Sequence, residues 1–405
     1  DALFDPFSEE SIASKIAEAL ENDVFREDLI RHGIQQAKKF SWDKSARRAV
    51  AALGQAIADR NQRLKIDLRP RRRPKLAYFS PLPPERSGIS DYSAELLPEL
   101  ARYYDVEVIT DLPEVSDLRI RGSFPTRSVD YFTQNPDHFE RVLYHFGNSF
   151  FHHHMFGLLD RFPGVVVLHD FFLGDAYEYL EHIVPGTWAL GLYNSHGYKA
   201  LWEKFNKIDV VFKYPGNFNI LERALGIIVH SNYSVRLADQ WYENSIAKHF
   251  EVIPMLRALV KNVERDEARK KLAIDKDDFL VCSFGILGPI KQNHRLLEAF
   301  QKSEMSNDPR CKLIFVGEND AREYGREFLE LISRSELKER ILITGWVDAD
   351  VFHNYLAAAD IAVQLRTTSR GESSAAVLDC MNHSLATIVN SNGSLAELPS
   401  DAVWK

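Results

Sequence analysis

Short runs rich in Val, Ile and Leu recur along the chain from residue 76 onward, each separated from the next by a helix-like stretch. Runs that are apolar at nearly every position are typical of strands buried on both faces of a parallel sheet. Alternation of such strands with helices predicts doubly wound α/β domains. The predicted strands are 76–80, 106–110, 141–146, 164–169, 225–230, 250–254, 279–285, 312–317, 340–345, 360–365 and 386–390.

The series of runs breaks near residues 255–265, so two doubly wound domains are predicted, at 76–255 and 266–405. A chain of 405 residues has enough apolar material for two such cores. In sheets of this kind, ligands bind outside the carboxyl ends of the strands and between domains. We therefore expect the functional residues directly after the predicted strands.

The first 64 residues, by contrast, contain only helical patterns. Apolar side chains at helical spacing predict a first helix around Ile12 and Ile16, and two more helices are expected at 24–39 and 42–59. Three amphipathic helices with no sheet of their own need a partner surface.

Residues 65–75 continue a stretch that begins at Arg63 and contains two prolines and seven basic residues. This composition predicts an extended, solvated linker. A patch that docks on anionic lipid at a membrane surface is the alternative.

Composition excludes several classes of function. The net charge is −8, which gives no global case for binding nucleic acid. The three cysteines are far apart in apolar runs, which favours a reduced, cytoplasmic protein. The chain begins without the pattern of a signal peptide, and no apolar stretch is long enough for a membrane helix.

The loop after the first predicted strand, PLPPERSGISDYS, holds Ser87 and Gly88 just before a helix. Gly88 would let the backbone approach a ligand at the helix start. The alternative is a turn glycine beside an ordinary helix cap. Neither the dinucleotide-binding GxGxxG pattern nor the P-loop pattern is present.

Polar residues also follow the third and fourth predicted strands. His169 and Asp170 come directly after GVVVL, and Asn148 follows Gly147. His169 is a candidate contact in a cleft, or a buried structural histidine. The three adjacent histidines 152–154 point about 100° apart on a helix and cannot converge on one metal ion. Asn148 is therefore the better candidate in that segment.

Lys291 lies near the start of the amphipathic segment after the strand 279–285. A lysine at a helix N-terminus destabilises the helix by about 0.3 kcal/mol or more, because its charge opposes the helix dipole. Binding of an anion there would offset this cost; a solvated lysine is the alternative.

The stretch TTSRGESSAAVLDCM follows the strand 360–365. If a helix begins at Ser373, then Glu372 and Asp379 share one helical stripe, roughly 10 Å apart. Ser373 and Ser374 would then present free backbone N–H groups to a phosphate. The alternative is a structural capping box formed by Ser369 and Glu372.

Arg366 and Arg370 add positive charge beside this stretch. A ligand with hydroxyl groups at both ends and a diphosphate between them fits such a set. A nucleotide sugar is a ligand of this kind.

Residues 75–405 resemble the retaining glycosyltransferases of family 4, which have the GT-B fold, through four segments in order: PPERSGISDYSAELLPEL, VVVLHD, GILGPIKQNHRLLEAF and the region from ITGWVDADVF to GESSAAVLDCM. The resemblance implies two Rossmann-like domains facing across a cleft. The similarity is strongest to bacterial multi-domain polysaccharide transferases.

The segments LFDPFSEESIASKIAEAL and FSWDKSARRAV resemble the C-terminal helices of such a module, whereas the chain stops at AELPSDAVWK. The chain thus resembles a fragment of a tandem transferase. We expect residues 1–64 to pack onto 266–405, in the same chain or from a neighbouring copy.

Carried over to this sequence, the resemblance implies that Glu372 holds the donor sugar and Asp379 the ribose. Lys291 would neutralise the diphosphate, His169 would contact the sugar near the reacting centre, and Gly88 would let its loop approach. Asn148 and Asp170 would lie on the acceptor side.

Two departures from the family pattern concern the donor site. The acidic pair is one residue closer than usual and ends in aspartate, and Ile286 replaces an arginine whose charge Arg366 or Arg370 could supply. The predicted function is retaining transfer of a hexose, such as mannose, from a nucleotide sugar to a glycan or lipid-linked glycan.

No metal or other cofactor is expected, because Asp348-Ala349-Asp350 is interpreted as a helix cap rather than a metal motif.

A GT-B epimerase or phosphorylase is a second enzyme class. A degenerate module that binds glycan or acts as a scaffold is the non-enzymatic alternative.

Overall fold

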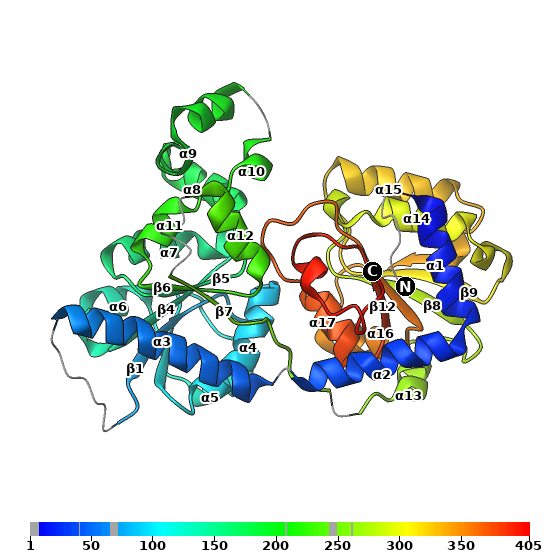
Figure 1. Cartoon of the computed structure of the whole chain (residues 1–405), viewed down its shortest axis with the longest axis horizontal. Helices are drawn as coiled ribbons and strands as arrows, with labels where there is room; N and C mark the ends of the chain where they lie inside the picture. Colours follow the sequence, from blue (N-terminus) through cyan, green and yellow to red (C-terminus); the bar gives the residue numbers. More distant parts are fainter. Residues whose placement is uncertain (1–7, 40, 65–71, 207–208, 243–248, 261) are drawn as a thin grey trace. The chain divides into compact units, whose positions relative to one another are not determined.

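The computed structural model describes residues 8–39, 41–64, 72–206, 209–242, 249–260 and 262–405. The chain divides into two compact units (Figure 1). Unit 1 comprises Asp1–Phe40, Leu259–Ser369 and Ser374–Lys405, and unit 2 comprises Ser41–Ala258 and Arg370–Ser373. Each unit contains one parallel sheet, so the predicted α/β class with two doubly wound sheets is confirmed.

The sheet of unit 2 has seven strands in the order β3-β2-β1-β4-β5-β6-β7. Its strands are β1 (Lys75–Phe79), β2 (Asp105–Ile109), β3 (Thr126–Arg127), β4 (Arg141–Phe146), β5 (Val165–Leu168), β6 (Gly226–Val229) and β7 (Phe250–Val252). The two-residue edge strand β3 is absent from the sequence prediction, because two residues carry no recognisable apolar pattern.

Helices flank this sheet, and one aromatic-rich core lies between them, with Phe79, Phe132, Phe146 and Trp188 fully buried. The helices of unit 2 after β1 are α4 (Gly88–Leu100), α5 (Leu118–Ser123), α6 (Val129–Gln134), α7 (His153–Arg161), α8 (Gly174–Ile183), α9 (Thr187–Asn206), α10 (Val210–Lys213), α11 (Phe218–Arg223) and α12 (Asn232–Trp241).

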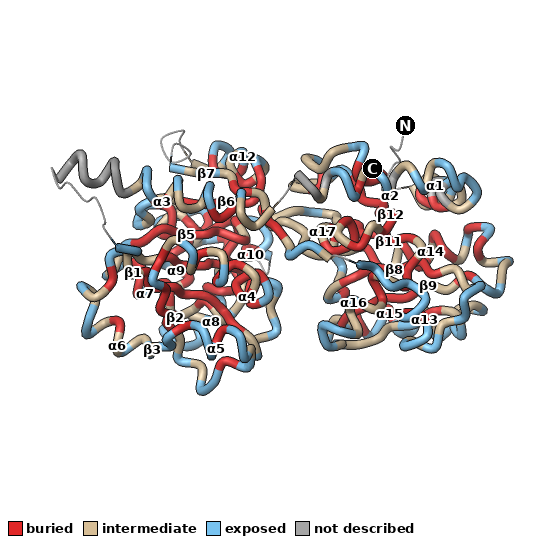
Figure 2. The backbone as a smooth tube through the Cα atoms, turned by 90° about the horizontal axis from the view of Figure 1, so that it is seen from below, coloured by how far each residue is buried: buried red, intermediate tan, exposed pale blue. Residues whose placement is uncertain are grey.

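The sheet of unit 1 has five strands in the order β10-β9-β8-β11-β12, and the backbone tube of Figure 2 shows strands such as β8 and β11 as largely buried. The strands are β8 (Phe279–Phe284), β9 (Cys311–Val316), β10 (Ile341–Ile343), β11 (Ile361–Gln364) and β12 (Ala386–Val389). The helices are α13 (Arg265–Lys271), α14 (Asn293–Lys302), α15 (Glu323–Arg334), α16 (Ala349–Ala358) and α17 (Ala375–Asn382). Asp348 caps α16 and accepts a hydrogen bond from Val351 N at 2.9 Å. The prediction that Asp348-Ala349-Asp350 forms a helix cap is therefore confirmed.

The first two N-terminal helices complete unit 1. Helix α1 (Glu9–Glu21) packs on α14 and buries Ile12 and Ile16 in the core beneath the sheet. Helix α2 (Asp23–Lys39) packs on α17 and β12, with the ring of Phe25 4.2 Å from that of Trp404.

Helix α3 (Trp42–Leu64) belongs instead to unit 2, where it packs on α4 and β6. The expectation that residues 1–64 as a whole pack onto 266–405 is therefore wrong for this helix. The buried side of α3, with Ala46 and Leu53, fits the surface of α4 and β6, and the ring of Trp42 lies 5.6 Å from Tyr92.

The basic stretch 63–75 is only partly within the described residues, since 65–71 lie outside them. Its described basic residues after that gap contact unit 2 itself. Arg72 pairs with Glu140 at 3.1 Å, Arg73 donates to the carbonyl oxygen of Ala101, and Lys75 pairs with Glu107 at 2.6 Å. In the described part of the chain, no helix has the length and hydropathy needed to cross a membrane.

The packing of α1 predicts a stability effect. Replacing fully buried Ile16 by Ala should lower the free energy of unfolding by about 3 kcal/mol, because transfer energy is lost and a cavity remains. Urea unfolding of the full chain measures this. Val24→Ala, on the exposed side of α2, is the matched control and should change stability by less than about 0.5 kcal/mol. Equal effects for the two variants would contradict the docking of α1.

Candidate functional site

In the sheet of unit 1, strands β9 and β10 are added on one side of β8, and strands β11 and β12 are added on its other side. The strand order therefore reverses between β8 and β11, although all the strands are parallel. Such a switch point opens a crevice at the carboxyl ends of the strands. Lys291 follows β8 and Arg366 follows β11, so these two predicted site residues flank the switch point.

Lys291 ends a short 3₁₀ turn, Pro289–Lys291, that precedes α14. Its Nζ lies 3.5 Å from the carbonyl oxygen of Phe284, at the end of β8. A Cβ atom at Gly285, which has φ +96°, would lie only 2.6 Å from this Nζ. The glycine therefore gives the ammonium group room directly at the carboxyl end of the central strand.

Hydrogen bonds tie the loops of this edge together. Arg366 N donates to Asn390 Oδ1 at 2.7 Å, and Asn390 Nδ2 donates to the Arg366 carbonyl oxygen at 2.6 Å. Thr367 N donates to the carbonyl oxygen of Ile290 at 2.9 Å. The structure thus brings the segments that carry Lys291 and Arg366 to one place.

Helix α17 begins at Ala375, and its cap is Ser374, whose Oγ accepts from Val377 N at 3.4 Å. The predicted start at Ser373 and the capping box of Ser369 with Glu372 are therefore wrong. Glu372 precedes the helix, so it does not share a helical stripe with Asp379. Asp379 lies on α17 and is buried.

In unit 2 the switch point lies between β1 and β4, and the predicted residues Gly88 and Asn148 follow these two strands. Ser87 Oγ accepts from Ile89 N at 3.2 Å and caps α4, so the cap interpretation of Ser87 and Gly88 describes this turn. A Cβ at Gly147 would lie 2.3 Å from Ile89 Cδ1, so the two loops touch.

Asn148 is held by two carboxylates. Its backbone N–H donates to Asp170 Oδ2 at 2.9 Å, and its Nδ2 donates to Asp175 Oδ2 at 2.7 Å. Its Oδ1 accepts from Asp175 N at 2.8 Å, at the start of α8. Asp175 was not among the predicted site residues, although an acidic residue in the first turn of a helix is a usable signal.

Residues 370–373, which belong to unit 2, join this cluster. The carbonyl oxygen of Arg370 accepts from Phe171 N at 2.8 Å, and its guanidinium pairs with Asp175 at 3.0 Å. Glu372 accepts from Arg370 N at 2.6 Å. Within unit 2 the structure therefore gathers Asn148, Asp170, Arg370 and Glu372, while Lys291, Arg366, Ser374 and Asp379 lie in unit 1; Ser373 ends the segment of unit 2.

Three buried histidines at the ends of β4, β5 and β6 form a hydrogen-bonded row. His145 Nδ1 and His169 Nε2 are 3.0 Å apart, and His169 Nδ1 and His230 Nε2 are 3.1 Å apart. His230 Nδ1 lies 2.8 Å from the carbonyl oxygen of Ile253, which can only accept. Each ring must therefore carry its proton on Nδ1 and donate along the row toward Ile253.

Both ring nitrogens of His169 are engaged in this row, and the ring packs edge-on against Tyr92 at 5.0 Å. A contact with a sugar through a ring nitrogen would require one of these bonds to be given up. His145 and His230 were not selected from the sequence, although His230, like His169, ends a predicted strand and His145 is the last residue but one of another.

Burial keeps the row neutral. It lowers the pKa of His230 from its usual value of 6.5 to about 4, and it lowers the pKa of His145 and of His169 well below that value, with neighbouring histidines adding to the effect. Protonation of His169 or His230 would place two donors face to face within the row.

No group of three or more His, Cys, Asp or Glu side chains that could hold a metal ion occurs among the described residues. His152 is buried, with its Nδ1 2.9 Å from the carbonyl oxygen of His145, and His153 Nδ1 lies 2.7 Å from the Phe150 oxygen.

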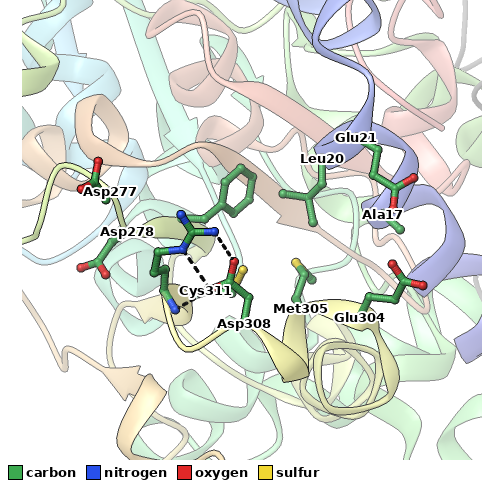
Figure 3. A pocket seen from close by; sticks show the side chains of 11 residues that line it. Ala17, Leu20, Glu21, Asp277, Asp278, Glu304, Met305, Asp308 and Cys311 are labelled. Carbon is green, nitrogen blue, oxygen red and sulfur yellow. Dashed lines mark hydrogen bonds and ion pairs between the residues drawn. The ribbon is translucent and has the colours of Figure 1, made fainter.

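A cavity of about 320 Å³ lies at the opposite edge of the sheet of unit 1 (Figure 3). Leu20 of α1, Phe279 at the start of β8 and Cys311 at the start of β9 line it. It marks the docking seam of α1 at the amino ends of the strands, away from Lys291.

The row predicts a pH dependence. Between pH 4 and 6.5 the unfolded chain binds protons that the folded His230 does not, so stability is full above pH 6.5 and falls as the pH is lowered toward 4. His230→Asn keeps a donor for Ile253 and should make the slope less steep by about 1.4 kcal/mol per pH unit. Urea unfolding at several pH values measures the slope. His182→Asn, at an exposed site on α8, is the control, and an identical slope in His230→Asn would contradict the buried row.

Residues 264–403 match the family model described as "Glycosyl transferases group 1". A search of curated protein sequences gives no match. Among solved structures, the chain is similar to Alr3699/HepE of Anabaena in complex with UDP and glucose, at 15% identity and a TM-score of 0.55, over 80% of this chain and 83% of that chain.

Two further solved structures share the fold. A glycosyltransferase from Rickettsia africae has 12% identity and a TM-score of 0.53, over 80% of this chain and 81% of its own. Sucrose-phosphate synthase from Thermosynechococcus elongatus has 16% identity and a TM-score of 0.51, over 80% and 82%. The chain therefore has the GT-B fold, and its residues 264–403 match the group 1 glycosyltransferase model.

Proposed function

We propose that this glycosyltransferase takes its sugar from a nucleoside-diphosphate donor that binds at the carboxyl edge of the sheet of unit 1. The observation that carries the proposal is the position of Lys291 and Arg366 on the two sides of the switch point. The complex of HepE with UDP and glucose supports a nucleotide-sugar donor.

Transfer of the sugar mainly requires stabilisation of the charges that develop in the transition state. When the glycosidic bond to the diphosphate breaks, negative charge grows on the leaving group and positive charge on the sugar carbon. Lys291 would neutralise the diphosphate, with Arg366 beside it, and the backbone N–H groups at the start of α17, after Ser373 and Ser374, would donate hydrogen bonds to a phosphate oxygen. This set needs no metal ion, and we propose a metal-independent reaction.

The carboxylates would bind the neutral parts of the donor. We propose that Glu372, from the extended segment before α17, binds sugar hydroxyls and that Asp379 binds the ribose. In unit 2, Gly88, Asn148 and Asp170 would form the acceptor side. His169 would contact the sugar from a ring held by the histidine row, as a positioning group rather than a proton acceptor.

The finer assignments rest on the sequence resemblance to family 4. They are a retaining reaction, a hexose such as mannose, and a glycan or lipid-linked glycan as acceptor in polysaccharide biosynthesis. The three cysteines, Cys282, Cys311 and Cys380, are free and buried, which supports a cytoplasmic setting. The alternative, a degenerate module that binds glycan or acts as a scaffold, is favoured by Ile286 at the position of the usual arginine.

Nucleotide binding provides the first test. Thermal unfolding with GDP, UDP, ADP or dTDP should show a higher midpoint with one of them, because a ligand at 100 times its Kd stabilises the native state by about 2.7 kcal/mol. An unchanged midpoint with all four would favour the degenerate module.

Lys291→Ala should reduce donor hydrolysis, measured as kcat/KM, by at least about tenfold, since one charge-assisted contact to the diphosphate is lost. Lys338→Ala, which removes an exposed lysine from another 3₁₀ turn of unit 1, is the matched control. Glu372→Ala should also reduce donor hydrolysis by at least about tenfold, since hydrogen bonds from the sugar hydroxyls to its carboxylate are lost. Unchanged activity in both site variants would overturn the site assignment.

A further inference from the structure

Large apolar side chains are exposed mainly in one part of unit 2. Of the 21 exposed large hydrophobic residues in the described part of the chain, nine lie between Tyr179 and Phe212. This segment contains the end of α8, all of α9 and most of α10, and Figure 1 shows α9 standing away from the seven-stranded sheet. Concentrated apolar exposure of this kind marks an interaction surface.

The second half of α9 carries the clearest part of this surface. Gly197, with φ +72° and ψ −168°, interrupts the helix, and a new helical stretch follows it. Tyr198, Trp202 and Phe205 are spaced i, i+4 and i+7 and therefore lie on one face. Their side chains are 71%, 51% and 71% exposed. We call these three residues the aromatic stripe.

The opposite face of this helix is anchored, so the outward direction of the aromatic stripe is fixed. Ala200 and Glu203 are buried. Glu203 Oε2 accepts from Lys213 Nζ at 2.6 Å and from the hydroxyl of Tyr214 at 3.1 Å. Rotation of the helix to bury the stripe would expose Ala200 and remove these bonds to a buried carboxylate, at a large cost.

Charge on α9 is one-sided. This helix presents no exposed carboxylate, in a chain with net charge −8, and the exposed Glu178 and Asp209 lie beyond its two ends. The two acidic residues in between are engaged. Glu203 pairs with Lys213, and Glu181 accepts from Trp188 N at 2.6 Å. Lys199, next to the stripe, is exposed.

We propose that the aromatic stripe and the exposed apolar residues beside it, Leu190 and Tyr193, dock on an anionic phospholipid surface. Helix α9 has Trp, Tyr and Phe on one face, a lysine at the margin and no exposed carboxylate of its own, which is the composition of a helix that lies in the membrane interface. Lys199 would attract the anionic headgroups. A polar protein partner would need complementary hydrogen-bonding groups, which the stripe does not offer apart from two aromatic tips.

This surface is distinct from the basic stretch 63–75, whose described residues Arg72, Arg73 and Lys75 are engaged with unit 2. It also goes beyond the proposed reaction, since lipid docking needs no donor. A transferase held at a membrane would meet a lipid-linked acceptor at its own surface.

Sedimentation with vesicles tests the proposal on the full chain. The parent should bind vesicles of phosphatidylcholine with 30% phosphatidylglycerol, a composition we choose for its negative charge. The triple variant Tyr198→Ser, Trp202→Ser, Phe205→Ser should bind at least fivefold more weakly. Trp202→Phe keeps the apolar face and should retain binding. Leu329→Ser with Leu331→Ser, which removes exposed leucines from α15, is the matched control and should bind as the parent does.

Four results would overturn the proposal: no binding by the parent, equal binding by the triple variant, loss of binding only in Arg72→Glu with Arg73→Glu, or dimers of the parent in sedimentation velocity that the triple variant lacks. The last result would assign the surface to a second copy of the chain. Nucleotide-dependent thermal shifts measured without vesicles show whether the triple variant is folded. They also separate this inference from the proposed function, because a chain that binds nucleotide but no vesicles contradicts docking alone.

Discussion

Burial of both faces of two parallel sheets is the constraint on which the rest of the structure depends. A strand covered by helices on both sides has to be apolar along most of its length, so polar chemistry is confined to the strand ends. Parallel strands place all their carboxyl ends at one edge, which collects residues from distant parts of the chain. In unit 1 that edge holds Lys291 and Arg366, and in unit 2 it holds Asn148, Asp170 and the histidine row.

Most of the fold could be predicted from the sequence for the same reason. Continuous apolar runs identify buried strands, and every predicted run from 76–80 to 386–390 overlaps an observed strand. The position of Lys291 after β8 and of Arg366 after β11 also follows from the runs. Details that depend on the path of a loop did not follow. The sequence pattern predicts a helix start at Ser373, whereas Ser374 caps α17 and Glu372 accepts a hydrogen bond from Arg370 N in the segment before it.

An amphipathic pattern predicts that one face of a helix is buried, but it does not show which surface that face packs against. The patterns of α1, α2 and α3 are of one kind, yet α1 and α2 complete unit 1 and α3 covers part of unit 2. The difference lies in the receiving surfaces, on α14, α17 and β12 in one case and on α4 and β6 in the other. The same limit applies to α9: the sequence does not show which of its faces is buried, whereas in the structure Glu203 is anchored inward and Trp202 faces solvent.

The row of His145, His169 and His230 has a further consequence for the strands that carry it. Strands β4, β5 and β6 are paired in parallel register, and the three rings all lie on one face of the sheet. A slip of one residue in any of these strands would turn its imidazole to the other face and leave buried nitrogens without partners. Apolar side chains alone are nearly interchangeable between alignments of buried strands. The three hydrogen-bonded rings therefore fix the register of β4, β5 and β6.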